Sequence, residues 1–236
     1  MTCILLTGSS RGIGAAIRHQ LQHRDVRVIG HATQSDNGSA IAADFSDPAA
    51  PALLWHAALE RSGGKIDVLI NNAGLFDAVK LGAKDADWLA EWQRTLDINL
   101  TAAAQLSRLA VLHWQARGAA GRIVHIASRA GHRGDSPAHW HYAAAKGGML
   151  AMHKTIARAY AKDRICSYAV APGFTDTAMA DDYLESRGGA GLLADIPLGR
   201  VAQPEEIANI AVYCALDAPE SLTGATLDAN GASHVR

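Results

Sequence analysis

The hydrophobic positions of the chain fall into two kinds of segment that follow one another in turn. Short, continuous apolar runs predict buried strands, and longer segments in which apolar residues recur every three or four positions predict helices. The predicted strands are 4–7, 26–29, 41–43, 65–70, 122–127, 165–171 and 225–228. The predicted helices are 12–23, 47–61, 86–117, 142–161 and 204–216. Because strands that alternate with helices pair in parallel and are covered on both faces, the pattern predicts an α/β fold with a doubly wound parallel sheet.

The segment after the sixth predicted strand breaks this regular alternation. Pro172-Gly173 ends the strand, and residues 174–200 show a mixed pattern in which Gly188-Gly189 and Gly191 are candidate hinges. The chain shows no internal repeat, linker or low-complexity tract. We therefore expect a single domain over residues 1–236.

The composition narrows the classes of function. Of 236 residues, 49% are hydrophobic and 19% are charged, an ordinary balance for a globular protein. The 22 basic and 23 acidic residues give a net charge of −1, so no basic field favours nucleic acid or an anionic membrane. There is no signal-peptide pattern, no window of transmembrane length and no C-x-x-C pair among the three cysteines. Reduced thiols in apolar segments fit a cytoplasmic protein.

The first predicted strand is joined to the first predicted helix by a glycine-rich turn, Gly8-x-x-x-Gly12-x-Gly14. Glycines at such a junction let the backbone turn sharply and approach a pyrophosphate, which the N–H groups and dipole of the helix N-terminus bind. Any strand–helix turn favours glycine, but a place at the first junction favours dinucleotide binding. The candidate cofactor residues of the turn are Gly8, Ser10, Arg11, Gly12, Ile13 and Gly14.

Tyr142 and Lys146 stand four positions apart in a predicted helix, so their side chains project from one face. A nearby cation favours the phenolate, and we expect Lys146 to lower the pKa of Tyr142 from its usual value near ~10. Such a phenol can donate a proton near neutral pH, as carbonyl reduction requires. Ser128, at the end of the fifth predicted strand, can donate to the same carbonyl oxygen. Alternatively, Y-x-x-x-K is a chance feature of a helix and Ser128 an ordinary strand-end residue.

Taken together, these motifs stand in the order typical of the short-chain dehydrogenase/reductase family. They are Thr7-Gly8-x-x-x-Gly12-Ile13-Gly14, Asn71-Asn72-Ala73-Gly74, Asn99, Ser128, Tyr142-x-x-x-Lys146 and Pro172-Gly173. The resemblance covers essentially the whole chain, and residues 28–33 and 170–174 look most similar to 3-oxoacyl-(acyl carrier protein) reductases. It implies a Rossmann-type sheet, with dinucleotide-binding motifs mainly in residues 1–100 and catalytic and substrate-binding elements mainly in residues 99–200.

The resemblance also implies roles for single residues. Tyr142 would donate the proton, Lys146 would lower its pKa and hold the nicotinamide ribose, and Ser128 would bind the carbonyl. Asn99, a poor helix former within a long predicted helix, would hold a water of a proton relay through the lysine; alternatively, it only marks a kink. Further cofactor contacts are implied for Asp44, Phe45, Asn72, Ala73, Gly74, Pro172, Gly173, Thr175 and Thr177, beside Tyr142 and Lys146.

The stretch after the second predicted strand predicts the choice of cofactor. NAD-specific sites place an acid there, which binds the ribose 2′-hydroxyl and repels a 2′-phosphate. Here the first acid is Asp36, whereas Arg11 lies in the glycine turn, and Thr33 and a protonated His31 would add contacts to a phosphate. We expect NADP(H) rather than NAD(H). The alternatives are that Arg11 is a solvated loop residue and that Asp36 swings back to serve NAD.

Some residues depart from the family pattern. His125 and Tyr168 take strand positions where the family often has asparagine. Ala119 and Asp163 fall in regions where carrier-protein reductases tend to present basic residues, and an acidic carrier protein would prefer a positive rim. The recognition of an acyl carrier protein is therefore in doubt.

The histidines at positions 132, 139 and 141 form a second unusual group. Their spacing matches no metal-ligand signature, and carboxylate support is thin. We expect His132, His139 and His141 to form a polar wall of the substrate cleft, and we expect no metal.

These observations predict an NADP(H)-dependent oxidoreductase that transfers hydride between a nicotinamide and a carbonyl or secondary alcohol. A 3-oxoacyl thioester of acyl carrier protein or coenzyme A is one candidate substrate. The alternatives are the same chemistry on a sugar, polyol, steroid or other ketone, and a non-catalytic NADPH-binding sensor. The resemblance further implies a homotetramer, or else a dimer, formed through the long predicted helices and the last strand.

Overall fold

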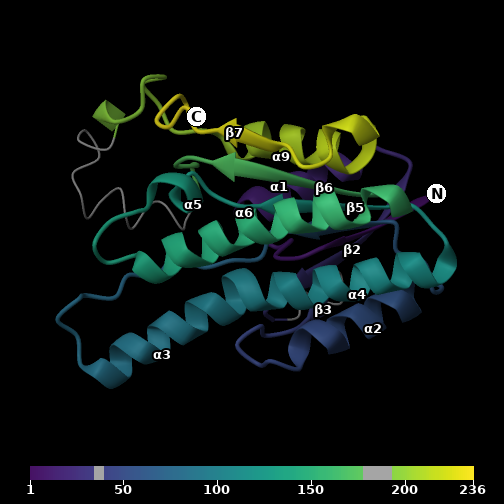
Figure 1. Ribbon diagram of the computed structural model, residues 1–236, viewed down its shortest axis with the longest axis horizontal. Helices are drawn as coiled ribbons and strands as arrows, with labels where there is room; N and C mark the ends of the chain where they lie inside the picture. The colour runs from purple at the N-terminus through teal and green to yellow at the C-terminus, as the bar shows by residue number, and fades with distance from the viewer. Residues whose placement is uncertain (35–39, 178–192) are drawn as a thin grey trace.

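The computed structural model describes residues 1–34, 40–177 and 193–236 (Figure 1). At its centre the described residues form a seven-stranded sheet in the order β3-β2-β1-β4-β5-β6-β7. Its strands are β1 (Thr2–Leu6), β2 (Val26–Ala32), β3 (Ala40–Ala42), β4 (Val68–Asn71), β5 (Gly121–Ile126), β6 (Ile165–Pro172) and β7 (Thr226–Ala229). Every pair of neighbours is parallel, so the predicted fold class is confirmed.

Helices cover both faces of this sheet (Figure 1). They are α1 (Gly12–Leu21), α2 (Ala50–Ser62), α3 (Asp85–Leu96), α4 (Ala102–Arg117), α5 (Ala130–Arg133), α6 (Trp140–Tyr160) and α9 (Pro204–Val212). Ile4 and Leu6 of β1 belong to the core under α1 and α9, whereas Cys3 and Leu5 belong to the core under α2 and α4. Because successive side chains of a strand point to opposite faces, a strand covered on both sides needs a continuous apolar run.

Two boundaries differ from the prediction for a physical reason. β2 continues past residue 29 to Ala32 because its last three residues pair with β3, and the first of them, Gly30, also pairs with β1. The helix predicted over residues 86–117 is two helices, α3 and α4, joined by the π-helical turn η1 (Asp97–Thr101). Such turns are frequent at functional sites. This one places the buried Asn99 against the loop that follows β4.

The strand order reverses between β1 and β4, and this position defines where a ligand can bind. The chain first builds outward to β2 and β3 and then returns to place β4 on the other side of β1. Parallel sheets bind ligands in the crevice outside the carboxyl ends of the strands at such a point. The loops after β1, β4, β5 and β6 open at this edge, and they carry the motifs found in the sequence.

Two remaining points concern the length of the helices and the residues outside the described ranges. None of the helices in residues 1–34, 40–177 and 193–236 is long and apolar enough to cross a bilayer. The candidate hinges Gly188, Gly189 and Gly191, and Asp36 as the alternative NAD ligand, lie outside the described residues. Those two predictions are therefore not tested.

Candidate active site

The glycine turn after β1 exposes bare backbone at the start of α1. Gly8 has a φ of +64°, a conformation that favours glycine, and a Cβ there would lie 2.8 Å from the Cα of Ala73. A Cβ on Gly14 would lie 1.9 Å from the carbonyl oxygen of Gly8. Glycine is therefore required at both positions. The backbone N–H groups of this helix start are left without covering side chains, as the binding of a pyrophosphate requires.

The loops after β1 and β4 are locked together by side-chain hydrogen bonds. The Oγ1 of Thr7 accepts the N–H groups of Asn72 and Ala73 at 2.9 and 3.0 Å. The Nδ2 of Asn72 donates in return to the carbonyl oxygens of Thr7 and Gly8, each at 2.9 Å. The amide of Asn72 therefore acts on the protein's own backbone, and it fixes the glycine turn against the end of β4.

A cleft of ≈ 380 Å³ runs across the carboxyl ends of the strands. It is lined by all of the catalytic and cofactor-binding residues predicted from the sequence except Asn99. These lining residues are Gly8, Ser10, Arg11, Gly12, Ile13, Gly14, Thr33, Asp44, Phe45, Asn72, Ala73, Gly74, Ser128, Tyr142, Lys146, Pro172, Gly173, Thr175 and Thr177. The structure thus brings these residues together. A cleft with the glycine turn, Ser128, Tyr142 and Lys146 in its walls fits a nicotinamide dinucleotide.

Ser128, Tyr142 and Lys146 form a cluster beyond the carboxyl end of β5. A hydrogen bond joins the side chains of Ser128 and Tyr142, and the N–H of Ala130 donates to Ser128 Oγ at 3.1 Å. The Nζ of Lys146 donates to the carbonyl oxygen of Ile126 at 2.8 Å and lies 5.7 Å from the centre of the Tyr142 ring. The two hydroxyl groups are close enough to bind one acceptor atom between them.

Burial sets the pKa values of this cluster. Burial raises the pKa of Tyr142 to about 12, against a smaller lowering by the Ser128 hydrogen bond. Burial also lowers the pKa of Lys146 to about 8. The prediction that the pKa of Tyr142 lies below its usual value is therefore wrong. The ammonium is turned to the Ile126 carbonyl, and the lost hydration of the phenolate outweighs its attraction.

Asn99 lies one layer behind the cleft and holds its wall. The Oδ1 of Asn99 accepts the N–H of Leu75 at 2.8 Å, and its Nδ2 donates to the carbonyl oxygen of Leu75 at 2.9 Å. The amide of Asn99 thus pairs with both backbone groups of Leu75, as a neighbouring strand would in a sheet. A Cβ on Gly74 would lie 3.2 Å from Asn99 Oδ1 and 3.7 Å from Lys146 Nζ, so asparagine and lysine meet beside this loop.

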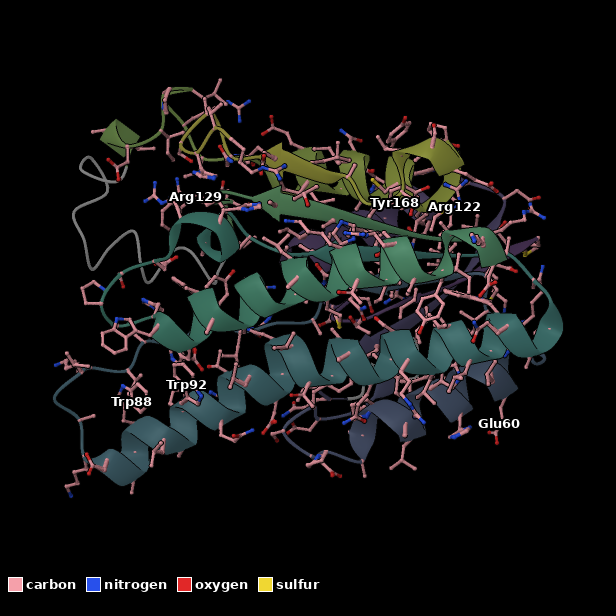
Figure 2. The ribbon with its side chains drawn as sticks, viewed as in Figure 1. Glu60, Trp88, Trp92, Arg122, Arg129 and Tyr168 are labelled. Carbon is pink, nitrogen blue, oxygen red and sulfur yellow. The ribbon has the colours of Figure 1, made fainter. Side chains whose placement is uncertain are left out.

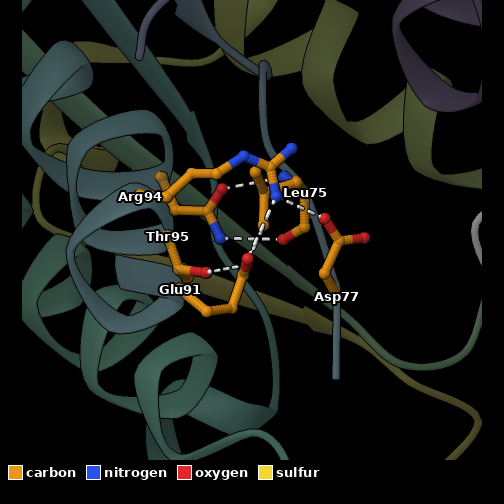
Figure 3. A network of polar contacts seen from close by, with 6 residues as sticks. Leu75, Asp77, Glu91, Arg94 and Thr95 are labelled. Atoms are coloured by element: carbon orange, nitrogen blue, oxygen red, sulfur yellow. Dashed lines mark hydrogen bonds and ion pairs between the residues drawn. The ribbon is translucent and has the colours of Figure 1, made fainter. Parts of the chain in front are cut away.

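An ion-pair network holds the loop after β4 at Asp77, two residues beyond Leu75 (Figure 3). Arg94 Nη1 on α3 donates to Asp77 at 2.6 Å and to Glu91 at 3.3 Å, and Thr95 Oγ1 donates to Glu91 at 3.2 Å. Arg94 is itself one of the residues that line the cleft. The network therefore fixes the chain after β4 to α3, and it engages the guanidinium of Arg94 within the wall.

His31, at the carboxyl end of β2, is a structural residue. Its Nδ1 accepts the N–H of Gly8 at 3.1 Å, and its Nε2 lies 2.8 Å from the carbonyl oxygen of Ala43, an arrangement that places the proton on Nε2. The ring stacks on Phe45 with centroids 4.3 Å apart, and burial lowers the pKa of His31. A neutral ring with both nitrogens engaged cannot bind a phosphate, so this part of the prediction is wrong.

The three histidines at positions 132, 139 and 141 point to different partners. His132 Nε2 lies 3.8 Å from Asp228, His139 Nδ1 lies 2.6 Å from Ser136 Oγ, and His141 Nδ1 accepts the next backbone N–H at 3.0 Å. None of the three lines the cleft, so the predicted polar wall is wrong. In the described part of the chain no cluster of three or more histidine, cysteine or acidic residues could hold a metal ion.

Three of the residues that depart from the family pattern lie away from the cleft. Tyr168 is fully buried in the core under α9, and its hydroxyl donates to the carbonyl oxygen of Pro219 at 3.2 Å. Ala119 and Asp163 come just before β5 and β6, at the amino ends of these strands. That edge of the sheet is opposite the cleft. The lack of a basic residue at these two positions therefore does not bear on the charge of the cleft rim.

The structure also adds cleft residues that carry no motif. Phe76 lines the cleft and meets the Tyr142 ring edge-on, with centroids 4.7 Å apart, and so fixes the orientation of the phenol. Arg129 and Phe174 line it together, with the guanidinium carbon 4.6 Å from the ring centre. In the sequence, only the position of Arg129 directly after Ser128 could have indicated that it lies in the cleft.

The fold and the site together define the class of this protein. A doubly wound parallel sheet with a glycine turn at its switch point, and a serine–tyrosine–lysine cluster in the same cleft, are typical of the nicotinamide-dependent α/β oxidoreductases. Residues 8–234 match the family model described as enoyl-(acyl carrier protein) reductase. The chain belongs to the short-chain dehydrogenase/reductase family, and it is an oxidoreductase that acts on a CH–OH or C=O group.

Relatives and solved structures similar to this chain extend over nearly all of it. It is 35% identical to the 3-oxoacyl-(acyl-carrier-protein) reductase FabG of Escherichia coli (98% of this chain, 96% of the relative) and 34% identical to that of Haemophilus influenzae (96% of both). A short-chain type dehydrogenase/reductase from Mycobacterium marinum matches with TM-score 0.90 at 26% identity (100% of this chain, 96% of the other). A structure from Agrobacterium tumefaciens with bound NADP, provisionally named a 2-deoxy-d-gluconate 3-dehydrogenase, matches with TM-score 0.85 at 27% identity (98% and 96%). The resemblance to the family, and within it to 3-oxoacyl reductases, is confirmed.

Proposed function

We propose that this chain is an NADP(H)-dependent reductase of a 3-oxoacyl compound or a similar small ketone. The observation that carries the proposal is the cluster of Ser128, Tyr142 and Lys146 in the same cleft as the glycine turn. In the proposed reaction the hydroxyl groups of Ser128 and Tyr142 donate to the carbonyl oxygen and stabilise the negative charge that develops on it.

The proposed reduction adds one hydride to the carbonyl carbon and one proton to the carbonyl oxygen. A bound reduced nicotinamide would supply the hydride, which gives the carbonyl carbon its new C–H bond and its two electrons. Tyr142 gives its phenolic proton to the carbonyl oxygen, which becomes the hydroxyl of the product. The ammonium of Lys146, near the Tyr142 ring, stabilises the phenolate left behind. Asn99 holds the cleft wall through Leu75, and its implied part in a proton relay through Lys146 stays a prediction.

Three observations support NADP(H) over NAD(H). Arg11 and Thr33 line the cleft and are exposed, so both are available to a 2′-phosphate. Among the described residues, β2 and the two positions after it, Thr33 and Gln34, contain no acid to bind a ribose 2′-hydroxyl. The similar structure from Agrobacterium tumefaciens was determined with NADP bound.

The substrate class is proposed from the names of the relatives. The FabG relatives are named for 3-oxoacyl groups on an acyl carrier protein, while the Agrobacterium structure is named for a sugar acid. We favour a 3-oxoacyl compound, with a sugar, polyol or steroid ketone as the alternative. We further propose a cytoplasmic enzyme, in keeping with three cysteines that are all buried thiols.

The experiment that tests this function follows NADPH absorbance against a panel of ketones. The panel contains 3-oxoacyl esters and thioesters, a keto sugar acid and a ketosteroid. NADPH-dependent turnover of the 3-oxoacyl compounds supports the proposal, and turnover of another member alone would reassign the substrate. Tight NADPH binding without turnover of any member would instead indicate a non-catalytic sensor.

A further inference from the structure

We propose that His31 is a positioning residue for the cofactor, which joins the glycine turn after β1 to the loop after β3, so that the binding of NADP(H) depends on the neutral ring. The inference rests on the proposed function, because it takes the cleft as the binding site of a dinucleotide. It gives His31, which cannot bind the phosphate itself, a part in building the site that does.

His31 receives three hydrogen bonds from the glycine turn. Its Nδ1 accepts the N–H of Gly8 at 3.1 Å, and its carbonyl oxygen accepts the N–H and the hydroxyl group of Ser9 at 2.8 and 3.2 Å. Gly30 makes room for this contact, since a Cβ there would lie 2.5 Å from Ser9 Oγ. His31 therefore fixes the start of the turn, whose backbone would bind the pyrophosphate, against the end of β2.

The opposite edge of the ring holds the loop after β3. Nε2 donates to the carbonyl oxygen of Ala43 at 2.8 Å, and the ring stacks on Phe45 with centroids 4.3 Å apart and an interplanar angle of 16°. Phe45 lines the cleft together with Asp44, which stands between these two contacts. One imidazole thus spans the gap between two loops that both face the cleft.

The order of the strands shows which half of a dinucleotide these loops would hold. The Ser128 cluster lies beyond β5, and the glycine turn lies beyond β1. If the nicotinamide is bound at the cluster and the pyrophosphate at the turn, the adenosine half extends over β2 and β3. His31 therefore sets the position of the adenosine site relative to the pyrophosphate site.

Both contacts of the ring require its neutral form. A ring that donates from Nε2 can accept at Nδ1 only while Nδ1 carries no proton. Protonation would direct a second N–H at the N–H of Gly8 and break the link to the glycine turn. His31 is 2% exposed, and burial lowers its pKa, so the ring is neutral at pH 7.

Burial, rather than a charged neighbour, is the main cause of the low pKa of His31. Both partners of the ring are backbone groups. The glycine turn, the loop after β3 and α2 lie against this part of the sheet, and in the described residues their charged and titratable side chains are all exposed, where water and salt screen them. They are Arg11, Asp44, Asp47, His56, Glu60 and Arg61.

The first test measures the Kd of NADP⁺ by calorimetric titration between pH 8 and pH 5, for the wild type and for His31→Asn. The amide oxygen of asparagine can accept the N–H of Gly8, but it does not titrate. Protonation of the cofactor's own 2′-phosphate affects both proteins alike, so the ratio of the two Kd values isolates His31. We expect the wild-type Kd, relative to that of His31→Asn, to be level above pH 6.5 and to rise by up to about tenfold per pH unit as the pH falls through the lowered pKa.

The second test separates positioning from catalysis at pH 7.5. His31→Leu removes both hydrogen bonds of the ring, so KM for NADPH should rise about tenfold or more, whereas kcat at saturating NADPH should stay within about twofold of the wild type. His31→Asn restores the acceptor for Gly8 and should have an intermediate KM. His19→Asn, at an exposed position of α1, is the matched control and should keep the wild-type KM and pH profile.

Three outcomes would overturn the inference. They are a Kd ratio that stays level or falls down to pH 5, a KM of His31→Leu equal to that of the wild type, and a kcat of His31→Leu that falls as far as its KM rises. Each leaves the proposed function intact, because the wild type still binds and uses the cofactor. A wild type that does not bind NADP⁺ would contradict both. If His31→Leu does not fold, the pH profiles of the wild type and His31→Asn decide.

Discussion

Tyr142 is an acid that the fold keeps in its protonated form. Since burial raises its pKa to about 12, nearly every molecule carries the phenolic proton at neutral pH. This is the state that ketone reduction needs at its start, because the oxygen of the reduced carbonyl is a much stronger base than a phenolate. The hydrogen bond from Ser128 and the ammonium of Lys146 favour the phenolate, but by less than burial disfavours it.

The first prediction concerns the substitution Tyr142→Phe. The ring and its edge-on contact with Phe76 remain, so folding and NADPH binding should be kept, while loss of the proton donor should lower kcat by ~10²–10⁴-fold. NADPH absorbance gives kcat, and cofactor fluorescence gives the Kd. Tyr160→Phe at the end of the same helix is the control and should keep wild-type turnover. Near wild-type kcat in Tyr142→Phe would show that another group donates the proton.

The second prediction concerns Arg11 and the choice of cofactor. A charge-assisted contact to phosphate is worth roughly 1.5–3 kcal/mol, so Arg11→Ala should reduce the ratio of kcat/KM for NADPH over NADH about tenfold or more. Arg61→Ala, an exposed arginine in the last turn of α2, is the control and should leave the ratio as it is. A wild type that prefers NADH, or an unchanged ratio in Arg11→Ala, would refute the proposed role of Arg11.

At the scale of elements, the π-helical turn between α3 and α4 links the helix layer to the cleft. Asn99 sits at the centre of this turn, is fully buried, and pairs with both the N–H and the C=O of Leu75. An unbroken α-helix would place residue 99 in a different direction around the axis. The helix irregularity is thus what lets one amide side chain hold the loop after β4.

The third prediction tests this link. Asn99→Ala leaves two backbone groups of Leu75 without their partner, so the free energy of unfolding should fall by about 1–3 kcal/mol and kcat should fall as the cleft wall loosens. Urea unfolding measures the first effect. Gln93→Ala, which removes an exposed hydrogen bond between α3 and Asp97, should change stability by no more than about 0.5 kcal/mol. Equal effects of the two substitutions would refute the special role of Asn99.

β5 carries a buried histidine that links stability to pH. His125 is fully buried, its Nδ1 lies 3.4 Å from Asn71 Nδ2, and the same amide donates to Ser107 Oγ at 3.1 Å. Burial lowers the pKa of His125 from the usual 6.5 to about 3. Between these two values the unfolded chain binds a proton at this residue that the folded protein does not.

The fourth prediction follows from that difference. The contribution of a neutral His125 is fully present above pH 6.5 and is lost as the pH falls towards 3, by up to about 1.4 kcal/mol per pH unit. His125→Asn should therefore lose less stability than the wild type between pH 7.5 and pH 5, as urea unfolding at both values can show. His56→Asn, at an exposed position of α2, should lose as much as the wild type. A wild-type slope in His125→Asn would contradict the assignment.

At the scale of the whole molecule, α3 presents apolar side chains at an outer edge (Figures 1 and 2). Thr95 is the one buried residue of this helix, whereas Trp88 and Trp92 stack with centroids 5.2 Å apart and Leu89 is 58% exposed. Nearby, Trp140 at the start of α6 is 52% exposed. Exposed apolar groups gathered in this way mark interaction surfaces.

The fifth prediction is that the protein is a homotetramer, or else a dimer, assembled through α3, α4, α6 and β7. Light scattering at micromolar concentration should give the mass of the assembly. Leu89→Glu should shift that mass towards smaller species, because it places a charge on the apolar face of α3. Leu53→Glu on α2, where the leucine is 64% exposed, is the control and should keep the wild-type mass. A monomeric wild type would contradict the prediction.

The sequence by itself determined the fold class and more than half of the cleft lining. The reason is that parallel strands buried on both faces need continuous apolar runs, and that their carboxyl ends meet at one edge of the sheet. Residues as distant in the chain as Gly8, Ser128 and Thr175 could therefore be assigned to one cleft before any contact was known. The only indication of the π-helical turn η1 in the sequence was Asn99, a polar residue within an apolar run.

The tertiary structure alone decided the chemical state and surroundings of these residues. The high pKa of Tyr142, the neutral ring of His31 and the separate partners of the three histidines depend on burial and on neighbours from other elements. Arg129 was placed in the wall of the cleft, against Phe174, only by the packing of β5 beside β6. The local sequence pattern shows which faces of the strands and helices are buried. The loss of hydration and the contacts between distant segments, which set the pKa values, arise only when the chain is packed.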